Sequence, residues 1–146
     1  MQTIIALDVG EKRVGIALLN LNNGVVLPLK TVSRASNQAL IEILRLIDEK
    51  DISTVVAGMP YGEKGEQTEQ CEDVRKFCRR LERRTSVPVV FMDEYSSSNE
   101  AAERLKQAGI STRKMKERGL IDPASAALIL EDYMHSLKNK RAQERE

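Results

Sequence analysis

The sequence predicts an α/β fold built on a mixed five-stranded sheet flanked by helices. Three segments with strand character come first, at residues 3–9, 13–20 and 24–33. Helical segments then alternate with short, wholly apolar segments at residues 54–58 and 87–92. Strands that follow helices in this way run parallel and are joined by right-handed crossovers. We therefore expect three antiparallel strands, followed by two that run parallel to the first.

The first strand should lie at the centre of the sheet. Its run from Ile4 to Leu7 is apolar at every position, as expected of a strand that is covered on both faces. The second and third strands are separated by Asn-Asn-Gly at residues 22–24, which tolerate the positive φ angles of tight hairpin turns. These two strands should form an antiparallel hairpin.

The spacing of apolar residues predicts four amphipathic helices, at residues 37–50, 68–84, 98–108 and 122–137. In the second of these, Cys71 and Cys78 share the apolar stripe with Phe77. Only His135 could join them in a metal site, because the chain has no other cysteine or histidine. We therefore expect both cysteines to be reduced residues of the core.

Composition limits the size and the partners of the protein. A chain of 146 residues suits one domain, which we place at residues 1–138, with a charged, flexible tail at 139–146. Its 23 basic residues are balanced by 22 acidic ones, so a nucleic acid would have to be held by local basic patches. No apolar stretch reaches the roughly 20 residues of a membrane span, and no secretory signal is recognisable. We expect a cytoplasmic protein.

Acidic side chains from separate parts of the sequence should meet at one edge of the sheet. Asp8 ends the buried first strand, where a carboxylate is costly unless a cation or backbone N–H groups pair with it. The carboxyl ends of parallel strands share one edge, so Asp93 and Glu94 should lie near Asp8. Strand alternation lets only one of these two face it. A further acid, Asp122, opens the last helix.

Such a gathering of carboxylates suits a hard divalent cation. Mg²⁺ prefers oxygen ligands and keeps several waters, which leaves positions for a phosphodiester. Two ions about 4 Å apart can activate an attacking water and stabilise the leaving oxygen. The residues therefore predict phosphodiester hydrolysis. Without metal, the acids should repel one another and the pKa of at least one should be raised.

Each acid also has a purely structural interpretation. Asp8 could bond its own backbone at the end of a strand. Glu94 could be a surface charge that follows its strand. Asp122 could cap the last helix, with Pro123 at the first helical position. Capping and metal binding by Asp122 are compatible roles.

Motifs along the whole chain resemble those of the YqgF/RuvX family. They are Asp8-Val9-Gly10-x-Lys12-x-x-Gly15-Ile16-Ala17, Gly58-Met59-Pro60 with Gly65, Asp93-Glu94 with Ser97 and Ser98, and Ile121-Asp122-x-Ala124-Ser125-Ala126-Ala127. The resemblance implies an RNase H-like domain and a cytoplasmic nuclease that processes the 5′ end of pre-16S rRNA in ribosome biogenesis. It also implies that Asp8, Glu94 and Asp122 are the catalytic residues and bind Mg²⁺ or Mn²⁺, with Asp8 bridging two ions.

The chain departs from the family pattern at two places. Tyr95-Ser96 stand where the family usually has Arg-Leu, which removes a cationic contact beside Glu94. Pro123 replaces the usual serine after Asp122. Both changes leave the three acids intact, so they bear on substrate contact more than on metal binding.

The remaining candidate residues would contact nucleic acid, either precursor rRNA or the ribosome. Lys12 and Arg13 lie beside Asp8 and could neutralise a phosphate. A basic group before Asp122 carries excess charge in a segment with little apolar content, although an ordinary loop is the alternative. The candidate substrate contacts are Lys12, Arg13, Met59, Pro60, Tyr61, Gly62, Gly65, Ser97, Ser98, Arg113, Lys114, Lys116 and Arg118.

Other functions stay open on sequence alone. A Holliday junction resolvase would cut DNA symmetrically and would therefore act as a homodimer. A non-catalytic ribosomal or nucleic-acid-binding factor could keep the fold without cleavage. Sugar and acetate kinases also begin with Asp-x-Gly after a strand, but their nucleotide site needs a second such domain, for which this chain is too short.

Overall fold

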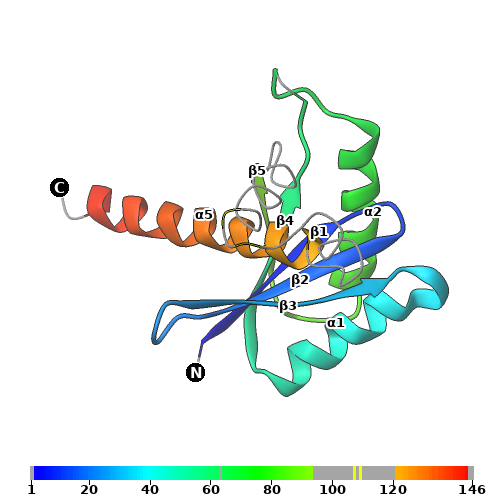
Figure 1. Ribbon diagram of the computed structural model, residues 1–146, viewed down its shortest axis with the longest axis horizontal. Helices are drawn as coiled ribbons and strands as arrows, with labels where there is room; N and C mark the ends of the chain where they lie inside the picture. The colour runs from blue at the N-terminus through cyan, green and yellow to red at the C-terminus, as the bar shows by residue number, and fades with distance from the viewer. Residues whose placement is uncertain (1, 63, 94–106, 108, 110–120, 145–146) are drawn as a thin grey trace.

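The computed structural model describes residues 2–62, 64–93, 107, 109 and 121–144. Figure 1 shows a twisted sheet with helices on both sides. In chain order the elements are β1 (Thr3–Val9), β2 (Arg13–Asn20), β3 (Val25–Ser33), the 3-10 helix η1 (Ala35–Asn37), α1 (Gln38–Glu49), β4 (Ile52–Met59), α2 (Glu69–Glu82), β5 (Val89–Asp93) and α5 (Ile121–Glu144).

The sheet has five strands in the order β3-β2-β1-β4-β5, so β1 is central as predicted. β1 and β2 are antiparallel, as are β2 and β3, whereas β4 runs parallel to β1 and β5 runs parallel to β4. The predicted mixed sheet is confirmed. The helix expected at residues 98–108 falls almost entirely outside the described residues.

The turn between β2 and β3 has the tight geometry that its sequence predicts. Gly24 has a φ of 72°, and its N–H donates to the Asn20 carbonyl at 2.8 Å. The side-chain oxygens of Asn20 and Asn23 accept from the backbone N–H groups of Asn22 and Val25, both at 2.9 Å. The asparagines therefore stabilise the turn through side-chain bonds, while glycine supplies the positive φ.

Helix α5 is longer than the sequence pattern indicates. We predicted residues 122–137, whereas the helix runs from Ile121 to Glu144. The residues beyond 137 lack apolar spacing, but lysine, arginine, alanine and glutamine are strong helix formers. Most of the tail expected at 139–146 is therefore helical. Neither α5 nor another helix in the described ranges is long and apolar enough to cross a membrane.

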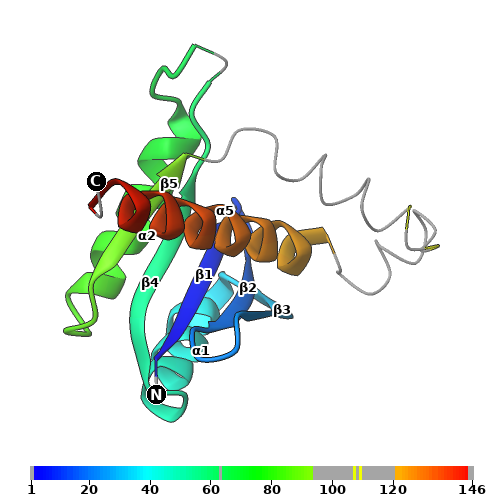
Figure 2. The ribbon, with the colours of Figure 1, turned by 90° about the vertical axis from the view of Figure 1, so that its left-hand side faces the viewer.

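The sheet separates two layers of helices. Figure 2 shows α5 crossing one face, with α1 and α2 on the other. Alternate residues of β1 point to these two layers: Leu7 and Val9 pack with α1 and α2, whereas Ala6 packs with α5. By the same alternation, Asp8 lies on the α5 face. The burial expected on both sides of β1 is confirmed, and it assigns Asp8 to the layer between the sheet and α5.

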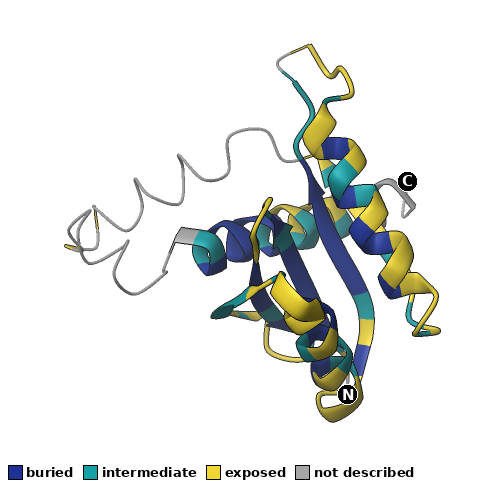
Figure 3. Cartoon of the chain, turned by 90° about the vertical axis from the view of Figure 1, so that its right-hand side faces the viewer, coloured by how far each residue is buried: buried dark blue, intermediate teal, exposed yellow. Residues whose placement is uncertain are grey.

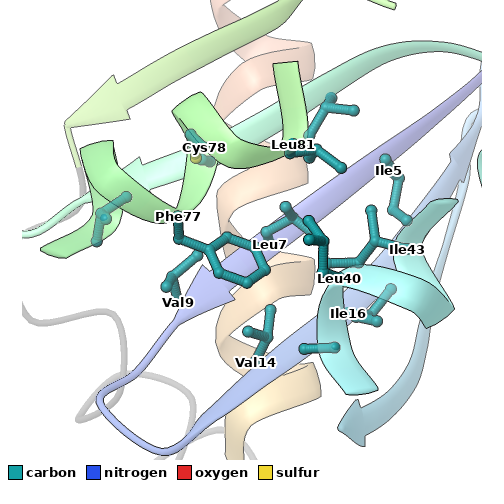
Figure 4. Packing of buried hydrophobic residues seen from close by; sticks show 14 of the residues in the cluster. Ile5, Leu7, Val9, Val14, Ile16, Leu40, Ile43, Phe77, Cys78 and Leu81 are labelled. Atoms are coloured by element: carbon teal, nitrogen blue, oxygen red, sulfur yellow. The ribbon is translucent and has the colours of Figure 1, made fainter. Parts of the chain in front are cut away.

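The main apolar core lies between the sheet and helices α1 and α2. Figure 4 shows Phe77 and Leu81 of α2 packed against β1 side chains, with Leu40 and Ile43 of α1 beside them. The opposite faces of both helices are largely exposed (Figure 3). Two further members of this core are the cysteines Cys71 and Cys78, which are buried and free, as predicted.

Ser125 of α5 is the one buried polar residue in the described ranges. Its side chain is fully buried, and its Oγ has no hydrogen-bond partner there. Because an unpaired buried hydroxyl opposes folding, Ser125→Ala is expected to leave stability unchanged or to raise it by about 1–2 kcal/mol. Thermal unfolding measures the change, with Ser136→Ala, exposed on the same helix, as the control. A stability loss above about 1 kcal/mol would mean that the hydroxyl has a partner.

Candidate functional site

Two of the three predicted acids lie on one face of the sheet. Asp8, near the end of β1, is partly buried and pairs across the sheet with Gly15 of β2. Asp122 lies in the first turn of α5, and a Cβ added to Gly15 would lie 2.2 Å from the Asp122 carbonyl oxygen. The start of α5 therefore rests directly on β2, next to Asp8. Only a glycine leaves room for such a close backbone approach.

The proximity of Asp122 affects the pKa of Asp8. The pKa of Asp8 is raised from 3.8 to about 6, first because its carboxyl group is buried and second because the Asp122 carboxylate is near. The sequence predicted a raised pKa for at least one of the gathered acids, and Asp8 confirms this expectation.

Asp122 pairs with an arginine rather than capping its helix. Helix α5 begins at Ile121, so Asp122 falls within the first turn and not at the N-cap position of the alternative structural interpretation. Its Oδ2 accepts a hydrogen bond from Arg13 Nε at 2.9 Å. Arg13 was expected to contact phosphate, and in this structure its guanidinium forms an ion pair with Asp122 while the side chain stays 67% exposed.

Asp93 lies on the face of the sheet opposite to Asp8. It stands beside Met59 in the register of β4 and β5, and Met59 belongs to the core under α1 and α2. The preceding residue, Met92, packs in the cluster on the α5 face, as strand alternation requires. Of the two neighbouring acids at the end of β5, Asp93 is therefore not the one that faces Asp8. Glu94 lies outside the described residues.

Removing the negative charge of Asp122 is expected to lower the pKa of Asp8. Because burial is the larger cause of the shift, Asp122→Asn should bring this pKa below about 6 but leave it above 3.8. NMR titration of the Asp8 carboxyl carbon, without metal, measures the change. Asp93→Asn is the control, since that residue lies on the other face. An Asp8 pKa that stays fixed or rises in Asp122→Asn would contradict the proximity of the two acids.

The loop after β4 contributes less to a substrate surface than the sequence suggests. Met59 is fully buried in the core, so its side chain cannot contact a substrate and the prediction for it is wrong. Tyr61 packs against the same core and is partly buried, so only part of its side chain is available to a substrate. Pro60 and Gly62 are partly exposed and Gly65 is exposed, where the loop projects beyond the sheet (Figure 1).

Of the other predicted substrate contacts, Lys12 lies within the described ranges and most of the rest lie outside them. Lys12 is exposed in the turn between β1 and β2, so it stays available to a substrate. Outside the described residues lie Glu94, Tyr95, Ser96, Ser97, Ser98, Arg113, Lys114, Lys116 and Arg118.

Arg34 reaches the site without any signal in the sequence. It follows β3 directly, and its Nη1 donates to the Gly10 carbonyl at 2.6 Å, two residues from Asp8. A single arginine in a connecting segment is unremarkable in a sequence. Only the pairing of β3 with β2 brings it to the turn after β1.

Asp8 and Asp122 form a donor set that suits a divalent metal ion. Carboxylate oxygens are ligands that Mg²⁺ and Mn²⁺ prefer. The raised pKa of Asp8 indicates that its charge is poorly compensated in the folded chain, and a bound cation would compensate it. Within the described ranges, no group of three acids, histidines or cysteines is close enough to hold a metal. The predicted third ligand, Glu94, is not among the residues searched.

Known proteins with similar sequences match this chain over most of its length. A sequence model described as "RuvX: Holliday junction resolvase" matches residues 2–136. A "Putative pre-16S rRNA nuclease" of Chloroflexus aurantiacus is 35% identical over 139 residues, which cover 94% of this chain and 90% of the relative. A protein of Methylobacillus flagellatus with the same name is 38% identical over 135 residues, covering 92% and 91%.

Solved structures share the fold at lower sequence identity. The fowlpox virus Holliday junction resolvase matches with a TM-score of 0.56 and 13% identity, covering 92% of this chain and 99% of the resolvase. RuvC of Thermus thermophilus, in complex with a Holliday junction substrate, matches with a TM-score of 0.54 and 11% identity, covering 93% and 96%. These similarities confirm the predicted RNase H-like fold.

Proposed function

Because this chain belongs to the RuvX family, we propose that it is a metal-dependent nuclease that processes the 5′ end of precursor 16S rRNA in the cytoplasm. Hydrolysis of phosphodiester bonds is the reaction class of the family. The RNA substrate is supported by the name of relatives that are 32–38% identical to the chain.

The meeting of Asp8 and Asp122 is the observation that carries the proposal. They come from opposite ends of the sequence, and the fold brings them to one face of the sheet at the end of the central strand. The charge of Asp122 contributes to the raised pKa of Asp8. A protein with no use for a cation has little reason to keep a poorly compensated carboxylate at this position.

Three acids of this chain would hold the metal: Asp8, Asp122 and Glu94. Glu94 is proposed as the third because Asp93, the other acid of the Asp93-Glu94 motif, lies on the face of the sheet opposite to Asp8. Bound Mg²⁺ or Mn²⁺ would supply the activation of the attacking water and the stabilisation of the leaving oxygen.

The other residues of the site would orient the acids and the substrate. Burial of Asp8 limits the access of bulk water to its carboxyl group. Arg13 holds Asp122 at the start of α5 and places positive charge beside that acid. Lys12 and the basic group at residues 113–118 would contact the phosphates of the RNA.

A cleavage assay with several substrates tests the proposal. The purified protein is incubated with precursor 16S rRNA, an unrelated single-stranded RNA and a four-way DNA junction, each with Mg²⁺, Mn²⁺ or EDTA. We expect metal-dependent shortening of the precursor 5′ end that EDTA abolishes. Glu94→Gln should lose the activity, whereas Asp93→Asn, the matched neighbour on the opposite face, should retain it.

The same assay separates the alternatives. Symmetric cuts in the DNA junction by a dimer, with no cleavage of the RNA, would favour the resolvase that the family description names. Tight binding of precursor RNA without turnover under any metal condition would favour a non-catalytic factor. Full cleavage by Glu94→Gln would exclude that residue as a ligand.

A further inference from the structure

The turn between β1 and β2 has few contacts of its own. It connects Asp8 on one side to Arg13 on the other, and Gly10 N–H donates to the Arg13 carbonyl at 2.9 Å. The side chains of Glu11 and Lys12 are exposed. The carbonyl groups of the turn therefore need donors from elsewhere in the chain if the turn is to stay in one conformation.

Arg34 donates to three successive carbonyls of this turn. Its Nη1 lies 2.6 Å from the Gly10 oxygen and 3.3 Å from the Glu11 oxygen. Its backbone N–H donates to the Lys12 carbonyl at 2.8 Å. One residue thus binds the turn from both its main chain and its side chain.

Helix α2 fixes the position of the Arg34 guanidinium. The Asp73 carboxylate accepts from both ends of this group, with Oδ2 2.6 Å from Nη1 and Oδ1 3.1 Å from Nη2. Such a two-point bond sets the plane of the guanidinium. The Phe77 ring, one turn further along α2, lies 5.2 Å from Arg34 Cζ.

Phe77 connects this anchor to the core. It is buried in the cluster that contains Val9, and Figure 4 shows the two side chains next to each other at the end of β1. Helix α2 therefore contacts the end of β1 directly through Phe77, and contacts the following turn through Asp73 and Arg34. Asp8 immediately precedes Val9, the first of these two points of attachment.

From these contacts we propose that Arg34 is a positioning residue for the metal-dependent cleavage site. Held by Asp73, it fixes the turn and so sets the positions of Asp8 before it and Arg13 after it. Arg34 itself would touch neither the metal nor the RNA, because both terminal nitrogens of its guanidinium donate to the turn or to Asp73. The catalytic part of this inference rests on the proposed nuclease function.

Arg34→Lys tests the role, because lysine keeps the charge but has no planar group that can bond the turn and both Asp73 oxygens together. We expect kcat to fall at least tenfold while KM for the RNA changes less than twofold. Hydrogen exchange at the Gly10 amide should become at least tenfold faster. Arg45→Lys is the matched control, because Arg45 also bonds two carboxylates, Glu42 and Glu49 of α1, away from the site. It should change neither quantity.

A second variant tests whether Asp73 acts through Arg34. Asp73→Asn should lower kcat and speed exchange at Gly10 in the same direction but less strongly. Combined with Arg34→Lys, it should add less than its separate effect, since both changes disturb one contact. Independent effects that multiply in full would overturn the shared mechanism.

The readouts also separate this inference from the proposed function. If the wild-type protein cleaves no RNA, the nuclease proposal fails, but exchange at Gly10 still shows whether Arg34 holds the turn. A kcat equal to that of the wild type in Arg34→Lys, with faster exchange, would overturn the catalytic role. Unchanged exchange would overturn the positioning role, and a raised KM with normal kcat would assign Arg34 to substrate binding instead.

Discussion

Replacing Asp8 by asparagine is expected to abolish metal-dependent cleavage and, at the same time, to stabilise the metal-free protein at neutral pH. Asparagine keeps the size of the side chain but lacks the charge that a divalent ion requires. The cleavage rate should fall on the order of 100-fold or more. The same substitution removes a carboxylate that is unfavourable in the folded chain.

The stability gain should depend on pH in a defined direction. The pKa of Asp8 is about 6 when the chain is folded and near 3.8 when it is unfolded, so the folded state holds the proton more tightly. Asp8 therefore costs nothing below pH 3.8, and stability falls as the pH rises through the window from 3.8 to about 6. Above that window the cost amounts to about 3 kcal/mol.

Urea unfolding in EDTA at pH 3.5 and pH 8 measures this difference. Asp8→Asn should match the wild type at the lower pH and exceed it by up to about 3 kcal/mol at the higher pH. Asp93→Asn, which replaces an exposed acid at the end of the edge strand β5, should show no such gain. Equal stability of Asp8→Asn and wild type at both pH values would mean that Asp8 is well compensated without metal. Full Mg²⁺-dependent cleavage by Asp8→Asn would exclude the site.

The sequence was sufficient to predict the centre of the sheet because the residues of β1 show that this strand is buried on both faces. The run before Asp8 is apolar at every position, which only a central strand with helices on both faces satisfies, and β1 is such a strand. The same reasoning marked Asp8 as unusual. It also predicted that only one of the two successive acids Asp93 and Glu94 can face Asp8.

Contacts between distant segments could not be predicted in the same way. Apolar periodicity shows which face of a helix is buried, but not where the helix crosses the sheet, so the pairing of Arg13 with Asp122 had no sequence signal. Met59 was assigned to the loop after the strand predicted at residues 54–58, yet β4 runs one residue past that end and carries Met59 into the core. Arg34 was not predicted either, because its contact with the turn after β1 depends on the pairing of β3 with β2.

Gly15 contacts the start of α5 and pairs with Asp8 across the sheet. We therefore expect Gly15→Ala to disturb both the packing of α5 and the site. The new Cβ would lie 2.2 Å from the Asp122 carbonyl oxygen and 2.3 Å from the carbonyl carbon. These are backbone atoms of a helix, so they cannot move aside without moving the start of α5. We expect a loss of about 3 kcal/mol, at the upper end for an overpacked site.

Gly62→Ala is the matched control, because the contact there is equally short but of a different kind. A Cβ at Gly62 would lie 2.1 Å from Glu66 Oε1, the far end of a flexible side chain that can rotate away. Urea unfolding should therefore show a large loss for Gly15→Ala and a small one for Gly62→Ala.

Displacement of α5 in Gly15→Ala should also be visible at Asp8. In the wild type, burial and the nearby Asp122 charge raise the pKa of Asp8 to about 6. Moving the helix start would reduce the burial of Asp8 and move the Asp122 charge away from it. In Gly15→Ala this pKa should fall towards 3.8, because the acid gains water and loses its charged neighbour. A variant that is destabilised but keeps an Asp8 pKa of about 6 would show that the packing of α5 and the spacing of the two acids are independent. The site would then not depend on the contact at Gly15.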